Sequence, residues 1–123
     1  MKSNELENRL IAFSVNVINR FQEVENNFAL EHLVKQIIRS STSPALYHVM
    51  AQNAKSTVEF ENNMKVGLKE LRATLVNLKI QKGIQNISDI EELQRLINEN
   101  NELIEIFVND IKTSKNKNKN IGF

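Results

Sequence analysis

The side chains that most often carry catalysis or bind metals are scarce in this chain. Its 123 residues include two histidines, His32 and His48, and no cysteine, which excludes thiol catalysis, zinc–thiolate sites and disulfides. A metal site on a helix needs a second ligand about one turn away. Glu31 adjoins His32 but points elsewhere on a helix, and no ligand lies one turn from His48. We therefore expect surface or packing histidines, with no metal and no cofactor.

Two pairs of acidic residues are the next candidates for chemistry. Glu59 with Glu61, and Glu91 with Glu92, have the side chains of a general acid and base. Both pairs fall in the first turn of an expected helix, however, where carboxylates interact favourably with the helix dipole. The sequence has no glycine-rich phosphate loop and no catalytic serine, histidine and aspartate set. We expect a protein that is not an enzyme and takes no small-molecule substrate.

Basic side chains are the strongest polar candidates. Lys65, Lys69 and Arg72 follow one another at spacings of four and three residues, which places them on one flank of a helix. This strip would suit phosphate or a partner protein. The simpler interpretation is a salt-bridge network that fixes helix packing, joined by Arg39 and by Glu70 reaching across to a neighbouring helix or subunit. The sequence leaves both interpretations open.

The C-terminal segment concentrates positive charge. The chain has a net charge of +1, but Lys112, Lys115, Lys117 and Lys119 leave 12 basic against 15 acidic side chains in residues 1–111. Lysines in a flexible tail would give weak, salt-sensitive contacts to RNA or DNA without reading bases. A solvated terminus is the simpler interpretation.

Apolar residues at helical spacing predict the elements that must carry these side chains. Three glycines and one proline leave little material for turns, which favours a few long helices. Short connections between long helices imply an all-α, antiparallel up-down-up-down four-helix bundle over residues 1–113. Residues 114–123 lack an apolar period and are expected to form a disordered basic tail. The expected helices span about residues 4–24, 27–52, 56–83 and 88–113.

Three local patterns refine these boundaries. Ser56 with Glu59, and Ser88 with Glu91, match the capping box that begins a helix. Ser43-Pro44 interrupts the second helix, because proline has no N–H and fits best in a first turn. The second helix therefore either breaks there or kinks, and we favour the kink.

The first and third helices carry a second apolar stripe beside their core-facing one. These extra residues either fill a wide core or form a subunit interface, since soluble monomers rarely expose large apolar patches. We favour the interface, and expect the chain to self-associate. The stripe residues are Ile11, Val15 and Ile18 on the first helix, and Val58, Val66, Val76 and Ile80 on the third.

Three sequence runs together resemble one protein family. They are Arg39-Ser-Ser-Thr-Ser-Pro-Ala-Leu46, Leu68-Lys-Glu-Leu-Arg-Ala-Thr74 and Ile111-Lys-Thr113. The combination is similar to the four-helix-bundle proteins encoded in 23S rRNA intervening sequences, and covers roughly residues 6–113. The resemblance implies a homopentamer of four-helix bundles, a bacterial cytoplasmic protein and no assigned enzymatic activity. Relatives include the accessory variability proteins of diversity-generating retroelements, which resemble basic pentamers that bind nucleic acid.

This chain departs from the family pattern at a polar cluster near the bend of the second helix. The altered positions are Tyr47, Met50 and Lys55, so a function located there in relatives would be lost or changed here. The acidic body of residues 1–111 also departs from the basic surface of the retroelement proteins.

These observations predict a cytoplasmic, non-catalytic structural or interaction module that associates with itself. The alternative is an accessory protein that binds RNA or DNA through the strip of the third helix and the C-terminal lysines. No apolar stretch approaches the length of a membrane span, and we expect neither a signal peptide nor a membrane partner.

Overall fold

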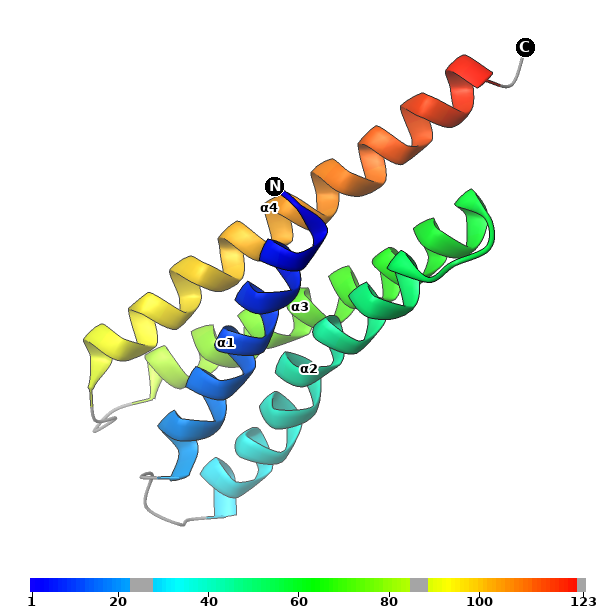
Figure 1. The fold of residues 1–123 in the computed structure, drawn as a ribbon. Coiled ribbons are helices and arrows are strands. Elements are labelled where there is room, and N and C mark those ends of the chain that lie inside the picture. The colour runs from blue at the N-terminus through cyan, green and yellow to red at the C-terminus, as the bar shows by residue number, and fades with distance from the viewer. Residues whose placement is uncertain (23–27, 85–88, 122–123) are drawn as a thin grey trace.

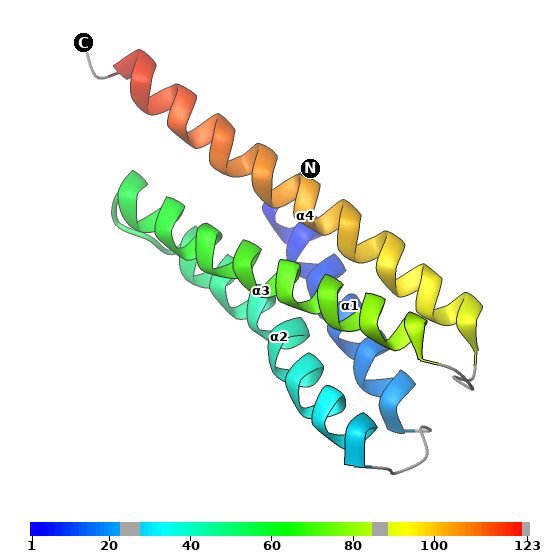
Figure 2. The same ribbon diagram turned by 180° about the vertical axis from the view of Figure 1, so that it is seen from behind.

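The computed structural model describes residues 1–22, 28–84 and 89–121. Within these ranges the protein forms four α-helices packed along one another, with no strand (Figures 1 and 2). The four-helix bundle predicted from the sequence is confirmed. The helices are α1 Ser3–Gln22, α2 Phe28–Gln52, α3 Thr57–Gly83 and α4 Ile90–Ile121.

The packing order of the helices decides which surfaces can be adjacent. Consecutive helices run in alternating directions in Figure 1, from the blue N-terminus to the red end of α4. Among the described residues α1 packs against α2 and α4, α3 packs against the same two helices, and α1 and α3 do not pack against each other. The outer sides of α1 and α3 therefore belong to diagonally opposite helices.

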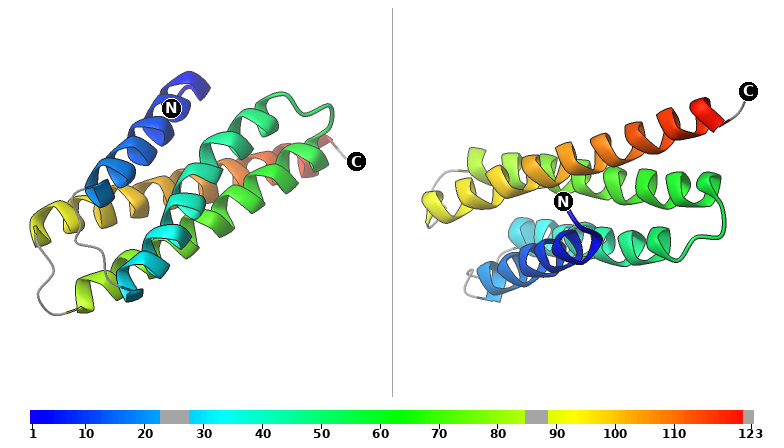
Figure 3. Two further views of the ribbon diagram at one scale, coloured as in Figure 1. Left: turned by 90° about the horizontal axis from the view of Figure 1, so that it is seen from below. Right: turned by 45° about the horizontal axis from the view of Figure 1, so that its top comes forward.

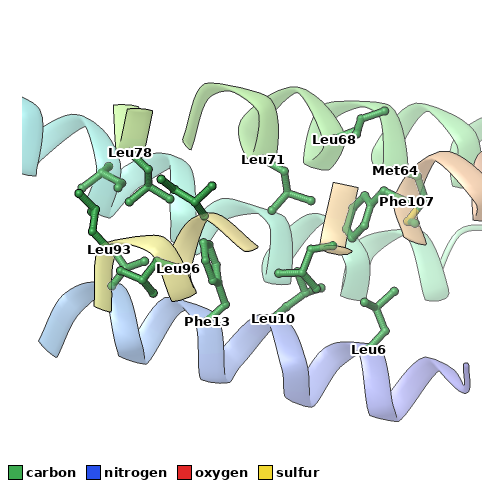
Figure 4. Packing of buried hydrophobic residues seen from close by; sticks show 14 of the residues in the cluster. Leu6, Leu10, Phe13, Met64, Leu68, Leu71, Leu78, Leu93, Leu96 and Phe107 are labelled. Atoms are coloured by element: carbon green, nitrogen blue, oxygen red, sulfur yellow. The ribbon is translucent and has the colours of Figure 1, made fainter. Parts of the chain in front are cut away.

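The core is built from one face of each helix. Phe13 of α1 and Phe107 of α4 are the largest fully buried side chains, and Leu10 of α1 and Leu71 of α3 lie between them (Figure 4). Gly67 of α3 lies against the ring of Phe107, and a Cβ there would come within 2.6 Å of the ring's Cε2 atom. The core residues include Leu6, Leu10, Phe13, Val17, Ile37, Met64, Leu71, Leu78, Leu93, Leu103 and Phe107.

The start of α3 confirms the predicted cap with one shift. The Ser56 hydroxyl accepts the N–H of Glu59 at 3.1 Å, as in a capping box. The Glu59 carboxylate reaches back to the N–H of Lys55 at 3.0 Å rather than to that of Ser56. The cap thus satisfies one N–H that the first turn leaves unpaired, and Glu59 satisfies the N–H of the residue before the cap.

The start of α4 is capped one residue later than predicted. Ser88 lies outside the described residues, and the helix begins at Ile90. Asp89 precedes it with a φ of 54° and accepts the N–H of Glu92 on its carboxylate at 3.0 Å. That hydrogen bond holds the pKa of Asp89 below its usual value, because it stabilises the charged form.

Helix α2 continues through Pro44, so a break at this residue is wrong, whereas the kink stays a prediction. Pro44 cannot donate to the carbonyl one turn earlier, and nearby hydroxyls supply donors to the helix carbonyls. Ser14 of α1 donates to the carbonyl of Ser41 at 2.9 Å. Ser43 does not cap a new helix, since its hydroxyl donates back to the carbonyl of Arg39 at 2.7 Å.

Helix α4 is longer than the sequence predicted. It continues past Thr113 to Ile121, across residues that we expected to be disordered. Residues 114–121 contain neither glycine nor proline, so nothing in them forces the helix to end. The end of α4 stands apart from the turn between α2 and α3 (Figures 1 and 3).

Candidate interaction surfaces

The second stripe of α1 lies outside the core. Phe13 and Val17 of this helix are essentially fully buried, whereas Ile11 and Val15 are each 48% exposed. Ile18 is partly buried. The core is therefore closed without these side chains, and the interpretation that they fill a wide core is wrong for Ile11 and Val15.

Helix α2 continues this apolar surface. The hydrogen bond from Ser14 to the Ser41 carbonyl fixes how α1 and α2 lie alongside each other. Since the two helices run in opposite directions, Ile18, one turn after Ser14, lies beside Ile38, one turn before Ser41. Ile38 is 38% exposed. We define the α1–α2 face as Ile11, Val15, Ile18, Ile38 and Val49.

The outer side of α3 is apolar and basic at once. On a helix of 3.6 residues per turn, Val58 and Val76 point in the same direction, and Lys65 and Lys69 lie within about 20° of that direction. All four side chains are exposed. The four predicted interface residues of α3 are between 37% and 61% exposed. We define the α3 face as Val58, Lys65, Val66, Lys69, Arg72, Val76 and Ile80.

The basic strip has no charged partner within the part of the chain that the structure describes. Lys65, Lys69 and Arg72 make no ion pair there, and neither does Arg39 on α2. Glu70 is half-buried and also makes none. The predicted salt-bridge network is therefore not found within one chain, and four cations remain available to an external partner.

Among the described residues, the ion pairs between helices join α1 to α4, and one further pair, Lys35 with Glu31, lies within α2. Arg9 of α1 donates to Glu99 and Glu102 of α4, and these bonds raise the pKa of Arg9 above its usual value. Such pairs tie α1 to α4 and neutralise part of the acidic body.

A shallow groove of about 330 Å³ runs beside the α3 face, between α2 and α3. It brings together three residues singled out in the sequence, Arg39, Val76 and Ile80, with Glu70. The remaining lining residues are Gln36, Ser40, Ala73 and Asn77.

The C-terminal lysines are carried on a helix instead of a flexible tail. Lys115 and Lys117 are exposed on α4, and the side chain of Lys119 lies outside the described residues. Since Arg39 lies on α2 and the strip lies on α3, the predicted basic residues are spread over three helices.

The altered polar positions are mostly on the surface. Met50 is 52% exposed, Lys55 is exposed and Tyr47 is half-buried. Leu46 is 66% exposed on the same helix, which the sequence analysis did not single out. The sequence offered one signal that Leu46 and Met50 are exposed, because they alternate along α2 with Pro44, His48 and Ala51, which are buried. A helix that packs on one side cannot bury side chains that point in all of these directions.

His48 is a packing residue. It is buried, its Nε2 atom lies 3.1 Å from the Ser3 carbonyl oxygen, and its ring centre is 6.4 Å from that of Phe107. Burial raises the pKa of the neighbouring Asp110 carboxyl, partly offset by the charge interaction with His48. His32 is exposed, and the described residues contain no group of three His, Cys, Asp or Glu side chains placed to hold a metal ion.

Comparison with known proteins adds one solved structure. No family model matches the chain, and no curated protein matches it. The crystal structure of a protein of unknown function from the S23 ribosomal protein family of Bacteroides thetaiotaomicron superposes with a TM-score of 0.80 and 27% sequence identity. The match covers 91% of this chain and 99% of that one, so the likeness spans the whole bundle.

None of the described helices is both long enough and apolar enough to cross a bilayer.

Proposed function

The chain fits the family of four-helix proteins encoded in 23S rRNA intervening sequences, and we propose that it is a self-associating interaction module without catalytic chemistry. The observation that carries this proposal is the exposure of the α1–α2 face beside a closed core. Large aliphatic side chains on two adjacent helices lose contact with water when a second copy covers them, at about 25 cal/mol per Å² of apolar surface.

The difference in charge between the two faces supports the α1–α2 face as the surface of the proposed self-contact. All five of its members are apolar. Two α3 faces meeting symmetrically would place Lys65, Lys69 and Arg72 of one copy near the same cations of the other, which like-charge repulsion opposes. The α1–α2 face can pair with itself in a two-fold dimer or with another surface of the next copy in a ring. The resemblance favours five copies.

Light scattering on paired variants tests the self-association. Val15→Glu places a charge in the middle of the α1–α2 face, and we expect it to reduce the mass to that of one 14.2 kDa chain at micromolar concentration. Val66→Glu on α3 is the matched control, since the proposed self-contact does not use it. Circular dichroism should report the same helicity for both variants. An unchanged mass for Val15→Glu contradicts the proposal.

A second candidate function is nucleic-acid binding, and the unpaired cations of α3 are the observation that favours it. Phosphate contacts from Lys69, Arg72, Lys115 and Lys117 would give an affinity that falls steeply with salt. The experiment is a titration with structured RNA and duplex DNA across a salt series. Lys69→Glu with Arg72→Glu should abolish the binding, and equal affinity in the double variant removes this candidate.

A further inference from the structure

The groove between α2 and α3 combines apolar side chains with basic side chains that make no ion pair among the described residues. Ala73, Val76 and Ile80 supply aliphatic atoms from α3, and Arg39 lies on the α2 side. Val76 is 57% exposed and Ile80 is 50% exposed, so neither is covered by the chain's own helices.

The floor of the groove requires no polar ligand. Ser40 and Asn77 are both buried there, and their hydrogen bonds are made within the protein. The Ser40 hydroxyl accepts from Thr74 at 2.8 Å. The Asn77 amide donates to the Leu33 carbonyl at 3.0 Å and accepts from Gln81 at 2.6 Å. An occupant of this groove would therefore gain mainly from burying apolar side chains against α3.

The charges around the groove favour an occupant of negative charge. Arg39, Lys69 and Arg72 are exposed and have no acidic partner among the described residues, while Glu70 is the one acid that lines the groove. Carboxylates on a partner would meet this excess of positive charge. Exposed ion pairs contribute only about 0–1 kcal/mol each, so charge selects the partner and apolar contact holds it.

We propose that the α2–α3 groove and its flanking cations form a docking site for an acidic amphipathic helix of a partner protein. A helix with apolar residues at i, i+3, i+4 and i+7 would place that stripe on Ala73, Val76 and Ile80, with flanking glutamates near Arg39 and Arg72. A nucleic acid would satisfy the cations but leave the aliphatic wall exposed. A second copy presenting its own α3 face would bring like charges together. This site is separate from the proposed self-contact on the α1–α2 face.

A synthetic helical peptide tests the docking site. The probe carries leucine at i, i+3, i+4 and i+7 with glutamate on both flanks, and the control peptide has the same composition in scrambled order. Fluorescence anisotropy with the full chain should show binding of the probe at least about tenfold tighter than binding of the scrambled peptide. Equal binding of the two peptides overturns the proposal, because charge alone would then account for the affinity.

Matched variants separate the groove from general charge. Ile80→Ser and Arg39→Glu should each weaken probe binding about tenfold. Lys112→Glu is the control for charge, since Lys112 is exposed on α4 and does not line the groove. An equal effect of Lys112→Glu and Arg39→Glu contradicts the proposal.

Two further outcomes identify a different occupant. If Ile80→Ser lowers the mass of the protein in light scattering, a second copy occupies the groove and the proposal is wrong. If an RNA hairpin or duplex DNA displaces the probe and binds Ile80→Ser as tightly as the unaltered chain, the cations serve nucleic acid and the proposal is again wrong.

Discussion

Helices α3 and α4 pack against each other but differ in their balance of buried polar side chains. Both helices bury apolar side chains, such as Leu71 of α3 and Leu103 and Phe107 of α4, and α4 also buries Asn100. Helix α3 buries Thr74, Asn77 and Gln81, while Val76 of the same stretch is exposed. An ordinary amphipathic helix follows the α4 pattern. Hydrogen bonds therefore specify the inner side of this stretch of α3, whereas its outer side leaves Val76 exposed.

The buried polar residues of α3 fix its position on α2. Thr74 donates to Ser40, and Asn77 donates to the carbonyl of Leu33, so two hydrogen bonds join the helices across the core. Asn100 of α4 is the counterpart on the other side, because it donates to the carbonyl of Leu71 at 3.0 Å. Hydrogen bonds of this kind require one alignment of the helices, which apolar packing alone does not.

The largest expected effect comes from the inner side of α4. Leu103→Ala removes a fully buried side chain and leaves a cavity, so it should lower the free energy of unfolding by about 2–5 kcal/mol. Val76→Ala on the outer side of α3 should change it by less than about 0.5 kcal/mol in the monomer. Urea denaturation of both variants measures the contrast. Similar losses for the two would mean that the outer side of α3 is not a free surface.

The contact between α3 and α4 at Gly67 should be the next most sensitive. Gly67→Ala would place a Cβ within 2.6 Å of the buried Phe107 ring, and we expect a loss of about 1–3 kcal/mol despite the better helix propensity of alanine. Adding Phe107→Leu should restore part of the loss specific to Gly67→Ala in a double-mutant cycle. A stabilised Gly67→Ala variant would show that the ring moves aside freely.

The hydrogen bonds on the inner side of α3 should matter to a similar or smaller extent. Asn77→Leu leaves the Leu33 carbonyl without its donor and the Gln81 amide without its acceptor, which should cost about 1–3 kcal/mol. Thermal unfolding monitored by circular dichroism measures this loss. A neutral or stabilising substitution would mean that Asn77 does not specify the position of α3 on α2.

The smallest expected effect on stability comes from Asp110 of α4 and depends on pH. Burial raises the folded-state pKa of Asp110, so this group lowers stability as the pH rises from the ordinary carboxyl value through the raised one. Asp110→Asn should therefore raise the unfolding free energy at pH 7 by well under about 1 kcal/mol, since solvent screens this partly exposed group. The gain should shrink as the pH falls toward the ordinary carboxyl range. A loss of stability at pH 7 would contradict the stated effect of burial.

The sequence predicted the helices and the exposed stripes because both depend on local spacing. Ile11 and Val15 could be separated from Phe13 and Val17 by helical period alone. The sequence left open whether α2 breaks or kinks at Pro44, because a proline within a helical pattern is compatible with either.

Some of the missed features are local, and others depend on distant parts of the chain. The sequence missed the cap at Asp89 and the extension of α4 past Thr113, because local sequence signals for the ends of helices are weak. The groove joins Arg39 to Val76 and Ile80, which only the packing of α2 on α3 brings together. That the α3 cations make no ion pair among the described residues likewise depends on how the other helices pack.

The most direct test of the central claim is the mass of the unaltered chain at micromolar concentration, measured by sedimentation equilibrium. If other copies of the chain cover the α1–α2 face, the mass should be a multiple of 14.2 kDa. It should stay the same at high salt, because salt screens charge interactions but not apolar contacts. A mass of 14.2 kDa at every concentration would contradict the claim that the exposed α1–α2 face is a surface for self-association.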